Sequence, residues 1–188
     1  MATARDIISD WPEESREAAQ LVIDAFGEPH ESAPSRLTWF DIDNSKRVVA
    51  KREFSHHDFP APHTDSVTST IAYRVPPELA SDIVAFDGSV TIARTDGEVS
   101  ATCHDVEANH LALNLVDDIV RGVYTAQEAR DYYGKEFLDY RRGKATPYMR
   151  KLRMTADENA ADSDERSLSD DDLEQAKAEG ERRKEQLV

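Results

Sequence analysis

The segment SVTIARTDGEVSATC (residues 89–103) places the strongest constraint on the fold of this chain. Runs of alternating apolar and polar residues flank the Asp96-Gly97 dipeptide, which readily adopts the positive φ angles of a type I′ turn. The segment therefore predicts a β-hairpin with a two-residue turn. The register of that turn pairs Ile92 with Ala101 and Val90 with Cys103, and it places all four side chains on one apolar face.

Three more segments are expected to be strands. Residues 36–42 and 47–54 flank a turn at 43–46 and form an antiparallel pair. Residues 66–75 alternate between apolar and polar side chains, as a half-buried strand does. The intervening SHHDFPAPHTD (55–65) is expected to be an irregular loop, because proline cannot donate a hydrogen bond to a β-ladder.

Helical spacing of apolar residues marks the rest of the folded region. Four helices are expected, over residues 12–26, 77–86, 106–121 and 125–140. The element order is then α-β-β-β-α-β-β-α-α. A five-stranded, mostly antiparallel sheet with its helices gathered on one face makes an α+β fold the expected result.

The chain is expected to divide into an α+β domain (residues 1–154) and an acidic tail (residues 155–188). Residues 155–168 are small, polar and charged, and are predicted to be a disordered linker. Residues 170–186 carry acids at their start and bases at their end, which matches the helix dipole. The sequence therefore allows a solitary helix there, although this segment has almost no apolar face.

The net charge of −15 comes from 38 acidic and 23 basic residues. Residues 155–188 carry 12 acids and 5 bases, which leaves −8 on the body. Such a bias fits a protein of a salt-rich cytoplasm, and it equally fits a generic acidic protein whose tail inflates the count. In both cases the acidic body argues against nucleic acid as a partner.

Cysteine content and hydropathy bear on the compartment. The single cysteine, Cys103, rules out an intramolecular disulfide and fits a reducing compartment. No stretch approaches the roughly 20 apolar residues of a membrane span, and the N-terminus has no signal-peptide core. We therefore expect a soluble, cytoplasmic protein that does not bind membranes.

Histidines are the first candidate functional residues, since the motifs of phosphate-binding loops, nucleophile elbows and zinc proteases are absent. If helix 77–86 makes a right-handed crossover, the loop at 55–65 and the end of the 89–103 hairpin lie at one end of the sheet. Imidazoles and nearby carboxylates (Asp58 and Asp65 in the loop, Asp105 and Glu107 after the hairpin) would then converge on a zinc-like or iron-like ion. The candidate metal ligands are His57, His63, His104 and His110.

The alternative for these histidines is that they are ordinary polar loop residues. Cys103 is not expected to be a nucleophile, because the hairpin register buries it.

The stretch RRGKATPYMRKLR (residues 141–153) is the second candidate, since it concentrates positive charge in an otherwise acidic protein. It is interpreted as a surface for an acidic protein partner, or as a dock for the acidic tail, rather than as a nucleic-acid site. A purely structural role, complementing the negative end of the last helix, is the other interpretation. The cations concerned are Arg141, Arg142, Lys144, Arg150, Lys151 and Arg153.

The segments FGEP, FPAPHTD, YRVP, FDGSV and LALNLVDDIVRG, within residues 26–122, resemble a group of small bacterial and haloarchaeal proteins described only as hypothetical. The similarity extends to about residue 150 and leaves out the tail. That group has no known activity, ligand or functional residue. The resemblance therefore implies only a self-contained body and an origin compatible with the acidic bias.

Two hypotheses follow from the sequence. The preferred one is a non-enzymatic binding or regulatory module that presents loop ends and the basic segment to a protein partner. The alternative is a metal-binding protein or metal-dependent enzyme that uses the histidines.

Overall fold

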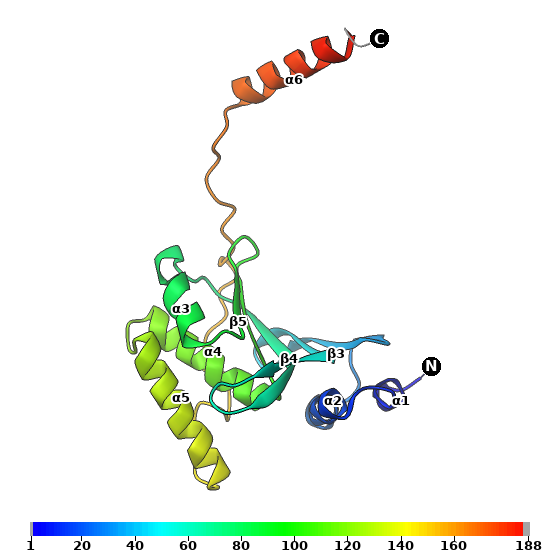
Figure 1. Ribbon diagram of the computed structural model, residues 1–188, viewed down its shortest axis with the longest axis vertical. Coiled ribbons are helices and arrows are strands. Elements are labelled where there is room, and N and C mark those ends of the chain that lie inside the picture. The colour runs from blue at the N-terminus through cyan, green and yellow to red at the C-terminus, as the bar shows by residue number, and fades with distance from the viewer. Residues whose placement is uncertain (1, 186–188) are drawn as a thin grey trace.

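A computed structural model describes residues 2–185 as an α+β fold built on one six-stranded antiparallel sheet (Figure 1). The strands lie in the order β1-β2-β3-β4-β6-β5. Their bounds are β1 (Glu31–Ala33), β2 (Arg36–Ile42), β3 (Ser45–His57), β4 (His63–Ala72), β5 (Val90–Ala93) and β6 (Glu98–Cys103).

Helices connect the strands and follow them. They are α1 (Ala4–Ile8), α2 (Glu13–Phe26), the 3₁₀ turn η1 (Pro77–Leu79), α3 (Ala80–Phe86), α4 (Val106–Val120), α5 (Ala126–Arg141) and α6 (Asp170–Glu185). A capping box begins α5, with Thr125 and Glu128 satisfying each other's backbone N–H groups. None of the described helices combines the length and apolar character that crossing a lipid bilayer demands.

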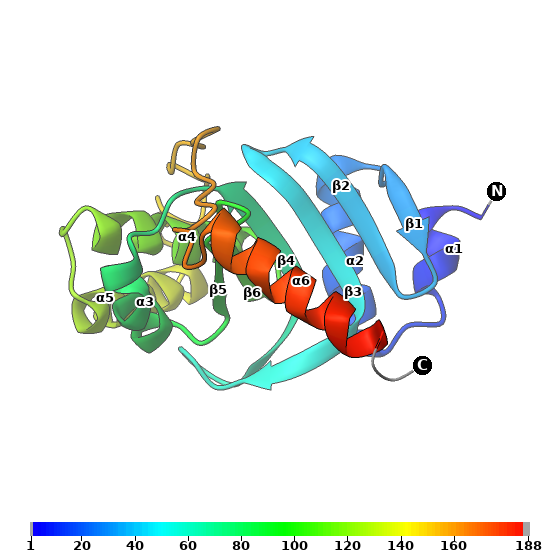
Figure 2. The ribbon, with the colours of Figure 1, turned by 90° about the horizontal axis from the view of Figure 1, so that it is seen from above.

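The core lies on one face of the sheet, where two helices each cover one half. Helix α2 packs on β3 and β4 around Trp39, and Figure 2 shows it behind the sheet. Helix α4 packs on β4 and β6, and α3 and α5 add a further layer around Phe86 and Tyr133. The opposite face carries hydroxyl residues, with Thr70 hydrogen-bonded to Ser100 at 2.9 Å.

The sheet has one strand more than predicted, and one hairpin has a different register. The short strand β1 extends the edge beside β2. In the β5–β6 hairpin, Val90 pairs with Ala101 and Ile92 with Val99, a shift of two residues from the prediction. The reason is the turn: only Gly97 has a positive φ, of 64°, so the loop spans residues 94–97 instead of two. An even shift keeps each side chain on its predicted face.

The prediction of an irregular loop at 55–65 was wrong. Strand β3 continues to His57 and β4 begins at His63, with His57 directly opposite His63. The ladder survives because both prolines fall in the connection at 58–62, beyond the last strand pair. The histidines are therefore held on paired strands.

The tail begins as a segment that contacts the body. Asp157 N donates to Ala72 O at 2.9 Å, and Asp162 pairs with Arg94 at 3.1 Å. Ala160 is buried against the β5–β6 turn at Gly97. Within the segment expected to be a linker (155–168), Asp157, Ala160 and Asp162 thus contact β4 and the β5–β6 hairpin. The helix expected over 170–186 is α6, which stands apart from the body in Figure 1, and residue 186 lies outside the described residues.

Candidate metal centre

The end of the β3–β4 hairpin holds two histidines and an aspartate on the same face of the sheet. His57 and His63 are cross-strand partners, so their side chains project together. Asp65 follows His63 by two residues on β4 and therefore points to the same side. This side faces the helices, so the cluster lies at the margin of the core.

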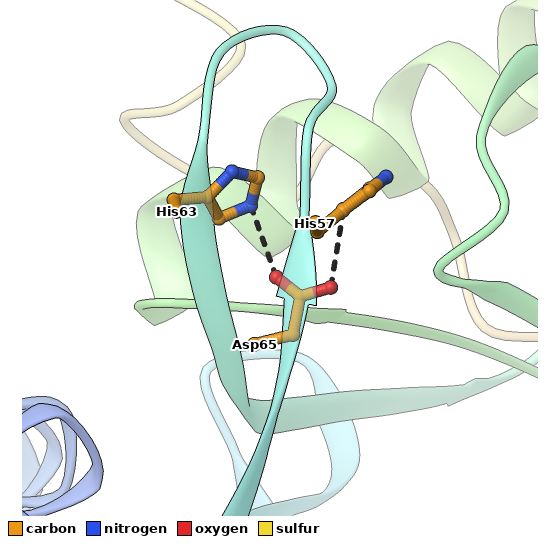
Figure 3. Close-up of side chains that lie close together, drawn as sticks. All are labelled: His57, His63 and Asp65. Atoms are coloured by element: carbon orange, nitrogen blue, oxygen red, sulfur yellow. Dashed lines mark ion pairs between the residues drawn. The ribbon is translucent and has the colours of Figure 1, made fainter.

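The three side chains converge on a small volume (Figure 3). His57 Nδ1 lies 3.1 Å from Asp65 Oδ2, and His63 Nε2 lies 3.0 Å from Asp65 Oδ1. The ring centroids of the two histidines are 5.0 Å apart. One ligand atom from each residue lies within 4.8 Å of the other two, which is the spacing of groups that share one ion.

The close contacts in the cluster are not all hydrogen bonds. Within residues 2–185, His57 Nδ1 and Asp65 Oδ1 are buried and have no hydrogen-bond partner, although each lies about 3 Å from an atom of opposite character. Their bond directions do not point at one another. A buried polar atom without a partner costs about 1–3 kcal/mol. The cluster therefore contains two buried polar atoms whose hydrogen-bonding capacity no described residue uses.

The ring nitrogens that do not face Asp65 also have polar neighbours. His63 Nδ1 lies 2.8 Å from the Ala61 carbonyl oxygen, which can only accept, so Nδ1 carries a proton. His57 Nε2 lies 3.8 Å from Oδ1 of the buried Asp87, which is beyond hydrogen-bond distance. Histidine ligands of metals are oriented by this type of outer contact.

The electrostatic potential at the cluster favours positive charge. The Asp65 carboxylate, followed by the Cys103 side chain, raises the pKa of His63 to about 11, against the opposing effect of burial. Asp65 and Asp87 are 7% and 2% exposed, so their charges act with little screening by water. A cation of either kind, a proton or a metal ion, is stabilised here.

Cys103 ends β6 beside the cluster. Its Sγ lies 3.3 Å from His63 Nε2. The segment at 55–65 and the end of the 89–103 hairpin therefore lie side by side. Burial raises the pKa of the Cys103 thiol, with His63 acting in the opposite direction. A Cys-His-Asp nucleophile needs its thiol and carboxylate on different ring nitrogens, whereas both lie at Nε2 here. The arrangement does not match that of a catalytic triad.

The loop that joins the two histidine strands is anchored by Phe59. Its ring lies 5.0 Å from that of Tyr133 on α5, and the guanidinium of Arg130 stacks on it at 3.9 Å. Arg130 also donates to the carbonyl oxygen of Phe86 on α3 at 2.6 Å. These contacts fix the hairpin end against the helices and so fix the directions of the two imidazoles.

The other two predicted ligands have different surroundings. His104 lies just beyond the end of β6 and lines a hollow with residues of α2, among them Glu17 and Leu21. His110 is buried in α4, with Nδ1 at 3.1 Å from Met149 O and Nε2 at 2.8 Å from Asp43 Oδ2. Neither belongs to the cluster of ligand atoms found among the described residues.

The basic segment forms a second candidate surface after α5. Lys144, Arg150, Lys151 and Arg153 line a hollow of about 860 Å³ together with Glu107 and Tyr140. The remaining two cations lie beside it on the last turn of the helix: Arg141 stacks on Phe137 at 5.2 Å and Arg142 lies 3.9 Å from Asp139. The tail contacts described above fall on Ala72 of β4 and on the β5–β6 hairpin, not on these cations.

Sequence reasoning missed two members of the neighbourhood, Cys103 and Asp87. The available signal concerned Asp65: residues two apart on a strand share a face, so the spacing indicates that the side chains of His63 and Asp65 project to the same side.

No family model, curated protein or solved structure matches this chain. The case for function therefore rests on the geometry.

Proposed function

We propose that this protein binds a divalent transition-metal ion through His57 Nδ1, His63 Nε2 and the Asp65 carboxylate. The observation that carries the proposal is the pair of buried, unpartnered atoms, His57 Nδ1 and Asp65 Oδ1, directed into the volume that the three residues share. Native interiors rarely leave such atoms without a partner.

The ligand chemistry selects among metals. Two imidazoles and one carboxylate suit zinc, and they also form the two-histidine, one-carboxylate set of non-haem iron. Calcium and magnesium prefer ligand sets made of oxygen alone. Zinc and iron(II) are therefore the two ions that this cluster fits.

The experiment is metal analysis and calorimetric titration of protein prepared without a histidine tag. We expect one zinc or iron ion per chain in the wild type and a loss of affinity of more than about 100-fold in His63→Ala, because removal of a direct ligand exceeds the 10–100-fold effect of outer contacts. His104→Ala is the matched control and should bind as the wild type does. Equal binding by both variants, or no binding by the wild type, contradicts the proposal.

A second function, binding of a protein partner that carries an acidic segment, is supported by the hollow lined by Lys144, Arg150, Lys151 and Arg153. Its volume of about 860 Å³ is large enough for several side chains of a peptide. Its cations stand out in a body of net charge −8, so a short acidic segment is attracted locally while a long nucleic acid is repelled by the rest of the surface.

Fluorescence anisotropy with a labelled glutamate-rich peptide tests this second function. Binding that weakens with salt and disappears in an Arg150→Glu, Lys151→Glu variant supports it. Arg74→Glu, on the far side of the body beside Asp162, is the control. Preferential binding of a single-stranded oligonucleotide would reject a protein partner in favour of nucleic acid.

A further inference from the structure

Resting on the proposed metal site, we infer that Cys103 is the fourth ligand and that the site is a closed, tetrahedral zinc site rather than an open iron centre. Cys103 ends β6 opposite Val67, which is two residues beyond Asp65 on the neighbouring strand. Residues 63, 65 and 67 share one face of β4, and cross-strand partners project to the same side. The thiol is therefore on the same face as the three other ligands.

Ligands of a tetrahedral zinc ion lie roughly 3.3–3.8 Å from one another, given bond lengths of about 2.0–2.3 Å. Cys103 Sγ lies 3.3 Å from His63 Nε2, and the His57–Asp65 and His63–Asp65 contacts, at 3.1 and 3.0 Å, are slightly shorter. Cys103 Sγ is not one of the ligand atoms that all lie within 4.8 Å of one another, so the thiol moves toward the other ligands when it joins the ion.

The charge of a thiolate is compatible with the site. Two neutral imidazoles, one carboxylate and one thiolate carry two negative charges, which offset those of a zinc ion, and a centre of zero net charge is the least costly one to bury. Cys103 and Asp65 are each only 7% exposed. The buried Asp87, 3.8 Å from His57 Nε2, places one more negative charge beside the ligands.

The binding step needs no redox partner. The Cys103 S–H bond breaks, a Zn–S bond forms with both electrons from sulfur, and the proton leaves to solvent. Zinc keeps its charge throughout. The product ties the β3–β4 hairpin end to β6, which makes the site a structural clamp.

The experiment is cobalt(II) substitution of the tag-free protein, followed by absorption spectroscopy. We expect one cobalt ion per chain, visible bands as intense as those of tetrahedral sites, and a sulfur-to-cobalt charge-transfer band in the near ultraviolet. Because Cys103 is the only cysteine in the 188 residues, that band in the wild type alone identifies the ligand, even if a variant fails to fold. Cys103→Ser should lose the band and bind cobalt at least about 10-fold more weakly.

Three results overturn the inference, and they differ in what they say of the metal site itself. Cobalt bound with weak visible bands and no charge-transfer band leaves the His57, His63 and Asp65 site in place and removes Cys103 from it. Failure to bind cobalt or zinc removes both. Retention of the band in Cys103→Ser would show that it does not arise from sulfur.

Discussion

Zinc should raise the thermal stability of the wild type by an amount that mass action sets. A ligand that binds only the folded state adds about 2.7 kcal/mol at a free concentration 100 times its dissociation constant. For chains of this size, 1 kcal/mol shifts the melting temperature by roughly 2–4 °C, so the expected shift is about 5–11 °C. Because His57 and Asp65 are close in sequence, the unfolded chain retains some affinity for zinc. This residual binding brings the expected shift in melting temperature toward about 5 °C.

The assay is calorimetry or circular dichroism melting of tag-free protein, first with a chelator and then with zinc. Magnesium at the same concentration is the ion control, because it prefers oxygen ligands. His63→Ala should lose the shift and His104→Ala should keep it. A zinc shift of the same size in His63→Ala would mean that zinc binds elsewhere, and no shift in the wild type would refute the reasoning.

Three further outcomes follow from contacts outside the cluster. Glu98 accepts two hydrogen bonds from Arg47, at 2.6 and 2.9 Å, and they lower the pKa of its carboxyl to about 2. The stabilisation that this ion pair gives the folded state is complete above pH 4.5, the ordinary pKa of the group, and is lost as the pH falls toward 2. Glu98→Gln should remove about 1–2 kcal/mol of that acid dependence in urea titrations, less than the shift implies because Arg47 is partly exposed to solvent. Gly97→Ala should cost about 1–2 kcal/mol for its φ of 64° and make the tail easier to cleave by protease, since the new Cβ would lie 2.2 Å from Ala161 N. If the acidic bias is an adaptation to salt, the melting temperature should rise between low and molar KCl, and a flat response would contradict this.

Much of the fold could be predicted because it depends on local patterns. The alternation in residues 66–75 and 89–103 determines which side chains face the core, and the faces predicted for Val90 and Cys103 are correct. The register of their hairpin could not be predicted. It depends on which loop residues adopt positive φ, and Asp96-Gly97 allows more than one answer. Strand β1 was missed because three edge residues hold too little pattern.

The candidate site was harder to predict, because its members meet through packing between distant segments. His57 and His63 were expected near the hairpin end that carries Cys103, and this proximity followed from the crossover between β4 and β5. Asp87 contributes from the end of α3, which no spacing in the sequence links to the histidines. His110 looked like a ligand in sequence. Its Nδ1 contacts the Met149 carbonyl oxygen and its Nε2 lies 2.8 Å from Asp43, but the described residues bring no third ligand group to it.

The choice between the adjacent His56 and His57 depends on an irregularity in β3. Val48 and Ala50 face the helices, so uninterrupted alternation would turn His56 inward and His57 outward. The pairing shifts between Ala50 and Ser55, where β3 contains three more residues than its partner strand. An odd number of extra residues reverses the alternation, and His57 faces the helices while His56 is exposed.

The adjacent pair therefore gives the most closely matched test of the metal site. His57→Ala should weaken zinc binding more than about 100-fold, because it removes a direct ligand. His56→Ala changes the same side chain one residue away, on the solvent side of the same strand, and should leave the affinity unchanged. Isothermal titration of both tag-free variants measures the difference. Equal weakening would indicate loose binding by a histidine-rich hairpin, and loss in His56→Ala alone would show that the irregularity in β3 does not set the face as described.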